Sequence, residues 1–192
     1  MQKFPLILDL ETKHTFREFD DPQKLGITVV GIYDYSDRQG YIYREEELRR
    51  LFPKLEKASY IIGFNSRSFD LAVLQAYYPG DVTKLPQFDI LDDIKRIIGK
   101  RVGLNDVAFA TNNEKKTGHG LMAIDYYKEG KWDELEKYCL SDVMVTQRLF
   151  DYGVKHDNIY YMNETGKVPI RVSWRRYMEE TGTDETALTL PF

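Results

Sequence analysis

The chain has 192 residues, of which 42% are hydrophobic and 30% charged, which is typical of a globular domain rather than of a disordered or fibrous chain. Its net charge of −4 argues against binding polyanions through bulk charge, although a local basic patch remains compatible with it. The single cysteine, Cys139, excludes an intramolecular disulfide, and the sequence has no membrane-length apolar run. Because residues 1–12 do not have the pattern of a secretory h-region, we expect no secretory leader. We therefore expect one cytoplasmic domain that does not engage a membrane.

The first half of the chain alternates strand and helix patterns. The apolar run 4–8 leads into Asp9, Leu10 and Glu11 and predicts a buried strand whose end carries carboxylates. Further along we expect strands over 27–35 and 40–43 in a hairpin, a helix over 45–57 that Pro53 breaks or kinks, a short strand over 60–64, and a helix over 68–78 that Ser68 caps and Pro79-Gly80 ends.

The second half is mostly helical. We expect a strand over 88–91, helices over 92–98, 104–110 and 119–128, a long helix over 132–156, and a hairpin over 158–174. This order predicts a single α/β domain with a mixed sheet, over residues 1–175, followed by a tail over 176–192.

Carboxylates occur at three places in the predicted strands and helices from which their side chains can converge. Asp9 and Glu11 share one face at the end of the first strand, because strand side chains alternate. Asp70 lies at the start of the helix after the buried strand 60–64. Tyr138 and Asp142 are four apart on the apolar stripe of the long helix, so both point toward the interior or a cleft.

Four convergent acids are suited to a phosphoryl-transfer site with two divalent ions. Mg²⁺ and Mn²⁺ prefer oxygen ligands and take a few carboxylates each. Two such ions can activate a water molecule and stabilise the leaving oxygen of a phosphodiester. A tyrosine beside the site can orient that water through a hydrogen bond.

Three stretches, ILDLET (7–12), GFNSRSFDLAVL (63–74) and YCLSDVMVTQRL (138–149), resemble the three motifs of the DEDD superfamily of 3′–5′ exonucleases. Tyr138 lies four residues before Asp142, the last Asp of the motifs. Five residues before Asp142, where the histidine subclass has His, this chain has Lys137. The chain therefore resembles the tyrosine subclass. Residues 88–153 resemble YprB-type ribonuclease H-like domains, some of which are joined to helicases. The resemblance implies a ribonuclease H-like mixed sheet of about five strands, one antiparallel, flanked by helices, with a C-terminal hairpin.

The resemblance also implies roles for individual residues. Asp9 would bridge two Mg²⁺ or Mn²⁺ ions, Glu11 and Asp142 would complete the nucleophile-side ion, and Asp70 would hold the second ion directly or through water. Tyr138 would position the attacking water. The remaining substrate-binding candidates are Thr12, whose backbone would meet the terminal sugar, Asn65 and Arg67. Many tyrosine-subclass enzymes have Asn four before the second Asp, where this chain has Ser66, so the role of Asn65 stays open.

These features predict a metal-dependent 3′–5′ exonuclease that acts on the 3′ end of single-stranded DNA or RNA and releases nucleoside monophosphates, with a helicase as a candidate partner. Two alternatives stay open: a structure-selective endonuclease on the same fold, and a non-catalytic nucleic-acid-binding module of a helicase or repair complex. The cations Lys95, Arg96, Lys100 and Arg101, with Arg67, Lys115 and Lys116, form either a phosphate track or a solvated helix face.

Overall fold

The computed structural model describes residues 3–114 and 121–178 of the chain. A five-stranded sheet has the order β3-β2-β1-β4-β5, and a separate hairpin consists of β6 and β7. The strands are β1 (Leu6–Thr12), β2 (Ile27–Asp34), β3 (Gln39–Arg44), β4 (Ile61–Gly63), β5 (Gln87–Asp89), β6 (Asn158–Asn163) and β7 (Gly166–Arg171). Only β2 runs antiparallel to its neighbours in the described sheet, which confirms the expected mixed sheet with one antiparallel strand.

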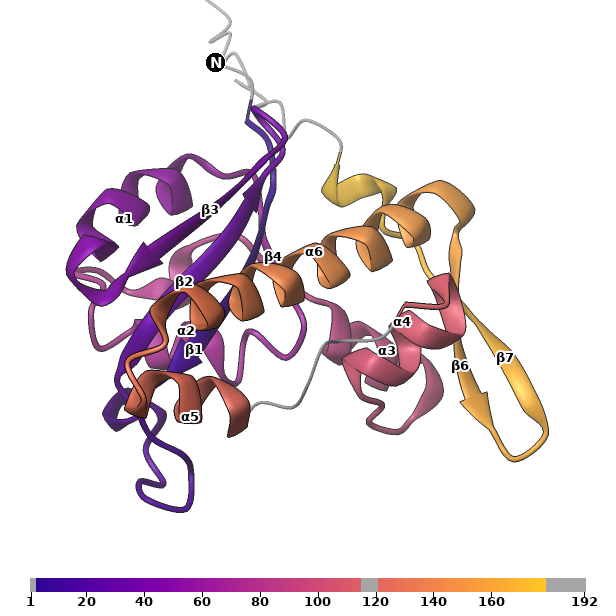
Figure 1. Ribbon diagram of the computed structural model, residues 1–192. Coiled ribbons are helices and arrows are strands. Elements are labelled where there is room, and N and C mark those ends of the chain that lie inside the picture. Colours follow the sequence, from indigo (N-terminus) through magenta and orange to yellow (C-terminus); the bar gives the residue numbers. More distant parts are fainter. Residues whose placement is uncertain (1–2, 115–120, 179–192) are drawn as a thin grey trace, which may run out of the picture.

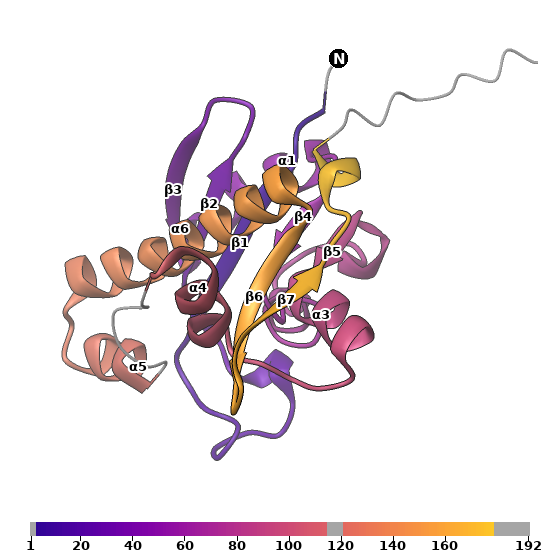
Figure 2. The ribbon, with the colours of Figure 1, turned by 90° about the vertical axis from the view of Figure 1, so that its right-hand side faces the viewer.

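The helices cover both faces of this sheet (Figure 1). They are α1 (Leu48–Lys57), α2 (Asp70–Leu74), α3 (Ile90–Ile98), α4 (Leu104–Asn112), α5 (Leu121–Lys128) and α6 (Trp132–His156). Leu6, Leu8 and Leu10 of β1 pack with leucines of α1 and α2 on one face. The long helix α6 crosses β1, β2 and β3 on the other face. The first part of α6 has α5 beside it, and its second half contacts α4 and the β6–β7 hairpin (Figures 1 and 2).

The bounds of α6 confirm the predicted helix, and its expected stripe is buried throughout. Three expectations on the helices α1 and α2 were wrong. Pro53 neither ends nor interrupts α1, because Leu51 and Leu55 on either side of it are fully buried and offset the lost hydrogen bond. Ser68 does not cap α2; its hydroxyl donates to the Asn65 side chain instead.

The helix α2 also ends earlier than Pro79-Gly80 predicts. After Leu74 the backbone tightens, and the amide of Tyr77 bonds the carbonyl of Leu74. The Tyr77 hydroxyl then donates to Glu45 at 2.7 Å and accepts the Ile27 amide at 2.9 Å. These long-range bonds hold the segment against β2 and the turn before α1, which the local pattern could not reveal.

The C-terminal part of the described chain is packed onto the domain. The ring of Trp174 covers α6 at Gly153, and the ring of Tyr177 stacks on Phe88 of β5 at 3.9 Å. The expected boundary at residue 175 therefore falls within a packed turn of residues 175–177. Most of the expected tail, 179–192, lies outside the described residues. No helix of the described chain is long and apolar enough to cross a membrane.

Candidate metal centre and active-site cleft

Asp9 and Glu11 lie on the face of β1 that α6 covers, because they alternate with Leu8 and Leu10, whose side chains enter the opposite core. The antiparallel pairing with β2 is irregular between Glu11 and Thr12. At this bulge the Thr28 hydroxyl donates to the Glu11 carbonyl at 3.0 Å. A bulge re-aims side chains locally, so it fixes the direction of the Glu11 carboxylate.

The helix α6 approaches the sheet closely opposite these acids. Gly31 of β2 pairs with Asp9, and a Cβ atom at Gly31 would lie 2.8 Å from Val143 Cγ2 and 3.0 Å from Cys139 Sγ. Only glycine leaves room for this approach. Because Asp142 lies next to Val143 along α6, the approach places its carboxylate beside β1.

Three carboxylates therefore meet between β1 and α6. One oxygen from each of Asp9, Glu11 and Asp142 lies within 4.8 Å of the other two. Asp142 is fully buried and Glu11 is 8% exposed, while Asp9 is half-buried. Burial, together with the charges of these three groups, raises the pKa of the Cys139 thiol well above its ordinary value. The thiol is a neutral packing group, and the electrostatic field around it is negative.

Asp70 lies next to this group through the backbone of β1. Its Oδ1 accepts the Leu10 amide at 3.0 Å, and the carboxyl is 3% exposed. In the described sheet, β4 pairs with β1 only at Leu6 and Ile7, so the Leu10 amide faces a part of the β1 edge that β4 does not cover. Asp70 thus replaces the missing strand partner and locks the start of α2 to the residue between Asp9 and Glu11.

The loop before Asp70 is held by a second buried acid, Asp89, which the sequence analysis did not single out. Its carboxylate accepts the Asn65 and Arg67 amides at 2.9 Å and also caps α3 through the Leu91 amide. Asn65 adopts a left-handed backbone with φ of 69° and accepts the Ser68 hydroxyl. Its side chain therefore supports the turn that leads to Asp70.

Ser66 occupies the position where many tyrosine-subclass enzymes have Asn, and it packs against a glycine. Ser66 is buried against the end of β4, and a Cβ atom at Gly63 would lie 2.5 Å from Ser66 Cβ. Ser66 is thus the buried residue of this turn, whereas its neighbour Asn65 is half-buried.

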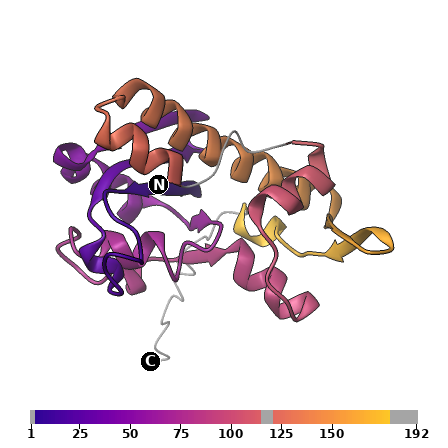
Figure 3. The same ribbon diagram turned by 60° about the horizontal axis from the view of Figure 1, so that its bottom comes forward.

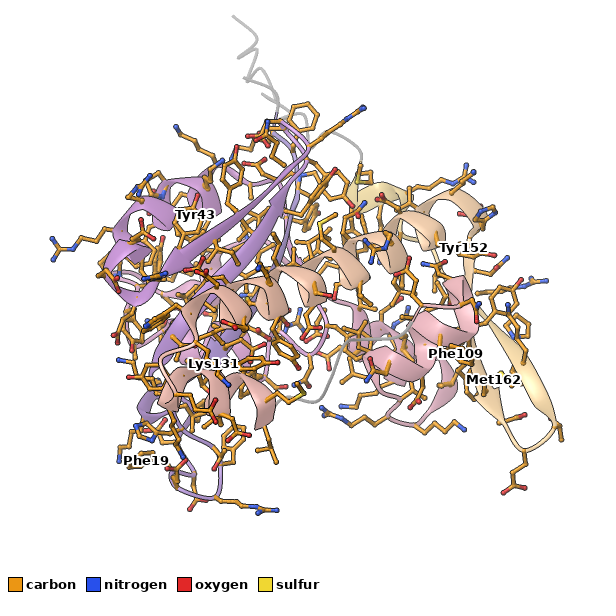
Figure 4. All side chains as sticks on the ribbon, viewed as in Figure 1. Phe19, Tyr43, Phe109, Lys131, Tyr152 and Met162 are labelled. Carbon is orange, nitrogen blue, oxygen red and sulfur yellow. The ribbon has the colours of Figure 1, made fainter. Side chains whose placement is uncertain are left out.

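Asp9 and Glu11 open onto a cleft of about 380 Å³. Its other described lining residues are Leu10, Thr12, His14, Thr15, Phe16, Leu25, Phe69, Leu121 and Ile124. The ring of Phe16 is 48% exposed and lies 5.8 Å from that of Phe69. Phe19 projects from the same loop, at the lower end of the molecule in Figure 4. An acidic floor beneath an exposed aromatic rim suits a ligand that carries both phosphate and a ring.

Tyr138 and Thr12 lie close to the carboxylates. Tyr138 is 5% exposed, one turn before Asp142, and packs with Ala123 and Tyr126 of α5. Thr12 lines the cleft and donates its hydroxyl to the His14 carbonyl at 2.8 Å.

Arg67 does not line the cleft within the described residues. Its guanidinium lies 3.6 Å from Asp92 and faces a neighbouring hollow beside α2. Lys115 and Lys116 lie outside the described residues.

The signals for Gly31 and Asp89 were present in the sequence. Glycine inside a strand indicates a close approach, and aspartate before a helix indicates a cap. Neither signal names the partner, which comes from another part of the chain. The aromatic rim at Phe16 carried no pattern in the sequence.

Comparison with known proteins identifies the family of this chain. A model of the RNase_H superfamily matches residues 6–154. A family B DNA polymerase from the hyperthermophilic archaeon Pyrobaculum calidifontis superposes with a TM-score of 0.56 at 19% identity over 78% of this chain and 24% of the polymerase chain. The Trypanosoma brucei RNase D superposes with a TM-score of 0.58 at 16% identity over 78% of this chain and 57% of its own.

At these identities the structural likeness concerns the fold alone, and this chain spans about a quarter of the polymerase and just over half of RNase D. No curated protein matches the chain at a significant level. The family model nevertheless covers most of the sequence, including β1, α2 and the carboxylate-bearing part of α6. The chain belongs to the RNase_H superfamily.

Proposed function

We propose that the chain is a metal-dependent 3′–5′ exonuclease that hydrolyses phosphodiester bonds of single-stranded DNA or RNA and releases nucleoside monophosphates. The observation that carries this proposal is the meeting of Asp9, Glu11 and Asp142 within 4.8 Å beside an open cleft. The resemblance of the three motifs and the place of Tyr138 support assignment to the tyrosine subclass and to YprB-type domains.

The donor set fits hard divalent cations. All three groups are carboxylates, and no softer ligand atom belongs to the cluster in the described chain. Mg²⁺ or Mn²⁺ bound in a pair there would supply an activated water molecule and neutralise charge at the phosphate. Asp9 is proposed to bridge the two ions, with Glu11 and Asp142 on the nucleophile side.

Asp70 is proposed to act at the second ion, directly or through water. Its bond to the Leu10 amide fixes the carboxyl beside the residues that hold the first ion. Asp89 then positions Asp70 indirectly, because it holds the two backbone amides at the start of the preceding turn.

Tyr138 is proposed to hold the attacking water through its hydroxyl. Its ring is enclosed by α5, so the hydroxyl has little freedom and can keep one orientation relative to Asp142. Burial of the ring therefore serves positioning as well as packing.

The cleft indicates where the terminal nucleotide would lie. Its base would stack on the exposed ring of Phe16, backed by Phe69, because aromatic faces accept any base. The backbone near Thr12 would meet the terminal sugar. Both DNA and RNA are therefore used as substrates in the test.

The test is cleavage of 5′-labelled single strands of DNA and RNA of identical sequence with Mn²⁺ or Mg²⁺. The proposal predicts a ladder that shortens from the 3′ end and disappears with a chelator. A few discrete internal cuts would indicate the endonuclease instead. Binding of the strands without any cleavage would leave the non-catalytic module and overturn the proposal.

A further inference from the structure

The basic residues of the chain are unevenly distributed. Segments 95–101 and 158–178 together contain eight of the 27 lysines and arginines but only one of the 31 acidic residues. The protein is acidic as a whole, so these two segments form a local exception to its net charge. They include the run of cations around Arg96 that the proposed reaction does not use.

The two segments are adjacent in the fold. Helix α3 packs against β7 on the side that Figure 2 shows. Between them lies a pocket of about 260 Å³ lined by Arg96, Arg171, Arg176, Ser173 and Asp93, with Ile97 and Val172. Three arginines and one aspartate therefore line the pocket, which carries excess positive charge.

The single acid in this pocket is already committed to other groups. Asp93 accepts the Trp174 indole N–H at 2.9 Å and the Arg96 guanidinium at 2.6 Å. Its side chain is 9% exposed, whereas that of Arg96 is 70% exposed. Asp93 thus orients Arg96 and holds the segment that carries Arg176, while the outer faces of the arginines remain accessible to an anion.

The pocket continues a strip that begins at the candidate active site. Asp89, the cap of α3, holds the loop before Asp70, and Arg96 lies about two helical turns further on, roughly 10 Å along the axis. Beyond the end of α3, Lys100 lies over the ring of Tyr161 at 4.5 Å. At the pocket itself, the Arg176 guanidinium lies over the ring of Tyr177 at 4.8 Å.

We propose that Arg96, Arg171 and Arg176 bind a backbone phosphate of single-stranded nucleic acid, in the part of the strand 5′ to the end that enters the carboxylate cleft. Guanidinium forks match the geometry of a phosphate group. Cations interleaved with aromatic rings are typical of surfaces that track a flexible single strand. This inference rests on the proposed nuclease function and assigns the strand its path from Asp70 toward the hairpin.

The experiment compares the double variant Arg171→Gln, Arg176→Gln with the matched control Arg49→Gln, Arg50→Gln. All four side chains are exposed, and α1, which carries the control pair, lies at the opposite end of the molecule from the hairpin (Figures 1 and 3). Binding to labelled strands of about 20 and about 4 nucleotides is measured by fluorescence anisotropy, with a chelator present and over a range of salt concentrations.

The proposal predicts that the pocket variant binds the longer strand about tenfold more weakly at low salt, and that the slope of log affinity against log salt falls by about 0.7, the value for one lost phosphate contact on a single strand. The shorter strand, which leaves less of its length outside the cleft, should lose much less affinity. The control should keep both affinities within about twofold.

The outcomes separate this proposal from the nuclease function. If the wild type cleaves strands but both double variants bind the longer one equally, the pocket proposal is overturned and the nuclease stands. If the wild type binds through the arginines without cleaving, the pocket proposal stands and the nuclease fails. If both strand lengths lose the same affinity, the arginines attract nucleic acid only through their general charge, and the proposed path is overturned. Thermal melting of each variant checks that the fold is intact.

Discussion

Asp9, Glu11 and Asp142 repel one another in the absence of a cation. At a separation of 4.8 Å, two ionised groups cost about 3 kcal/mol at an effective dielectric constant near 20. We expect Asp9→Asn to abolish cleavage while the melting temperature in metal-free buffer stays the same or rises, because one repelling charge is removed. A clear fall in that melting temperature would mean that Asp9 stabilises the fold through its own contacts.

Tyr138 is predicted to act on the attacking water rather than on the metal ions. Tyr138→Phe keeps the packing against α5 but removes the hydroxyl. We expect cleavage to slow by about a hundredfold or more, since a positioned proton-transfer group typically contributes about 10²–10⁴-fold. Metal-induced stabilisation should be unchanged in the same variant. An unaltered cleavage rate would assign Tyr138 to packing alone.

Alternation along β1 and the spacing on α6 were sufficient to predict which acids share a face. The bond from Asp70 to the Leu10 amide was not predictable, because it depends on where β4 stops pairing with β1. The same holds for Asp89, whose partners are 22 and 24 residues away. Residue types and local periods do not contain such long-range contacts.

At the scale of elements, the site depends on how closely α6 approaches β2. Gly31→Ala would place a methyl group 2.8 Å from Val143 Cγ2. We expect a loss of about 1–3 kcal/mol in the free energy of unfolding from overpacking, and weaker Mn²⁺ binding because Asp142 moves with the helix. Urea denaturation and a metal titration measure the two effects.

Val143→Ala in the Gly31→Ala background provides the control for that prediction, because it removes Val143 Cγ2, the methyl group that clashes with the new Cβ atom. Partial recovery of both stability and metal binding is expected. Recovery of stability without recovery of metal binding would contradict the link between the helix position and the site.

The β2–β3 hairpin is tied to α1 by Asp34. Burial alone would raise the pKa of this carboxyl, but Lys54 at 2.6 Å and the Ser36 hydroxyl and amide hold the pKa below its ordinary value. A lowered pKa in the folded state means that the stabilisation is present above the unfolded value near 3.9 and is lost as the pH falls through the folded pKa.

Asp34→Asn is therefore expected to lower the free energy of unfolding by about 1–2 kcal/mol near neutral pH. The difference from the wild type should shrink below about pH 4, as measured by urea denaturation across the acid range. A difference that stays constant into strong acid would show that Asp34 acts through its shape rather than its charge.

Element types and their order followed from the sequence, with α6 as the clearest case. The end of α2 did not, because tertiary bonds of the Tyr77 hydroxyl decide it. The continuity of α1 through Pro53 depends on burial of the flanking leucines in the core, which outweighs a local rule.

For the molecule as a whole, the family and the mixed sheet were within reach of the motifs. The position of the hairpin beside α3, and the arginine pocket that results, required the structure. A run of cations in a sequence does not reveal which other cations it will meet. The separation of the acidic cleft from the basic strip is therefore a property of the fold rather than of either segment.

The central claim is that β1 and α6 together form a divalent-metal centre. Linkage requires that an ion bound only by the folded state stabilises it, by about 2.7 kcal/mol at a hundredfold excess over Kd. For a chain of this length that corresponds to a rise of roughly 5–10 °C in melting temperature. Asp133→Asn is a matched control, since Asp133 is an exposed acid in the first turn of the same helix.

The most direct test is thermal melting of the wild type, Asp142→Asn and Asp133→Asn over a titration with Mn²⁺. The account predicts that the wild type and Asp133→Asn gain this stabilisation and that Asp142→Asn loses nearly all of it. A wild type that Mn²⁺ does not stabilise, or an Asp142→Asn variant that is stabilised as much as the wild type, would contradict the metal centre.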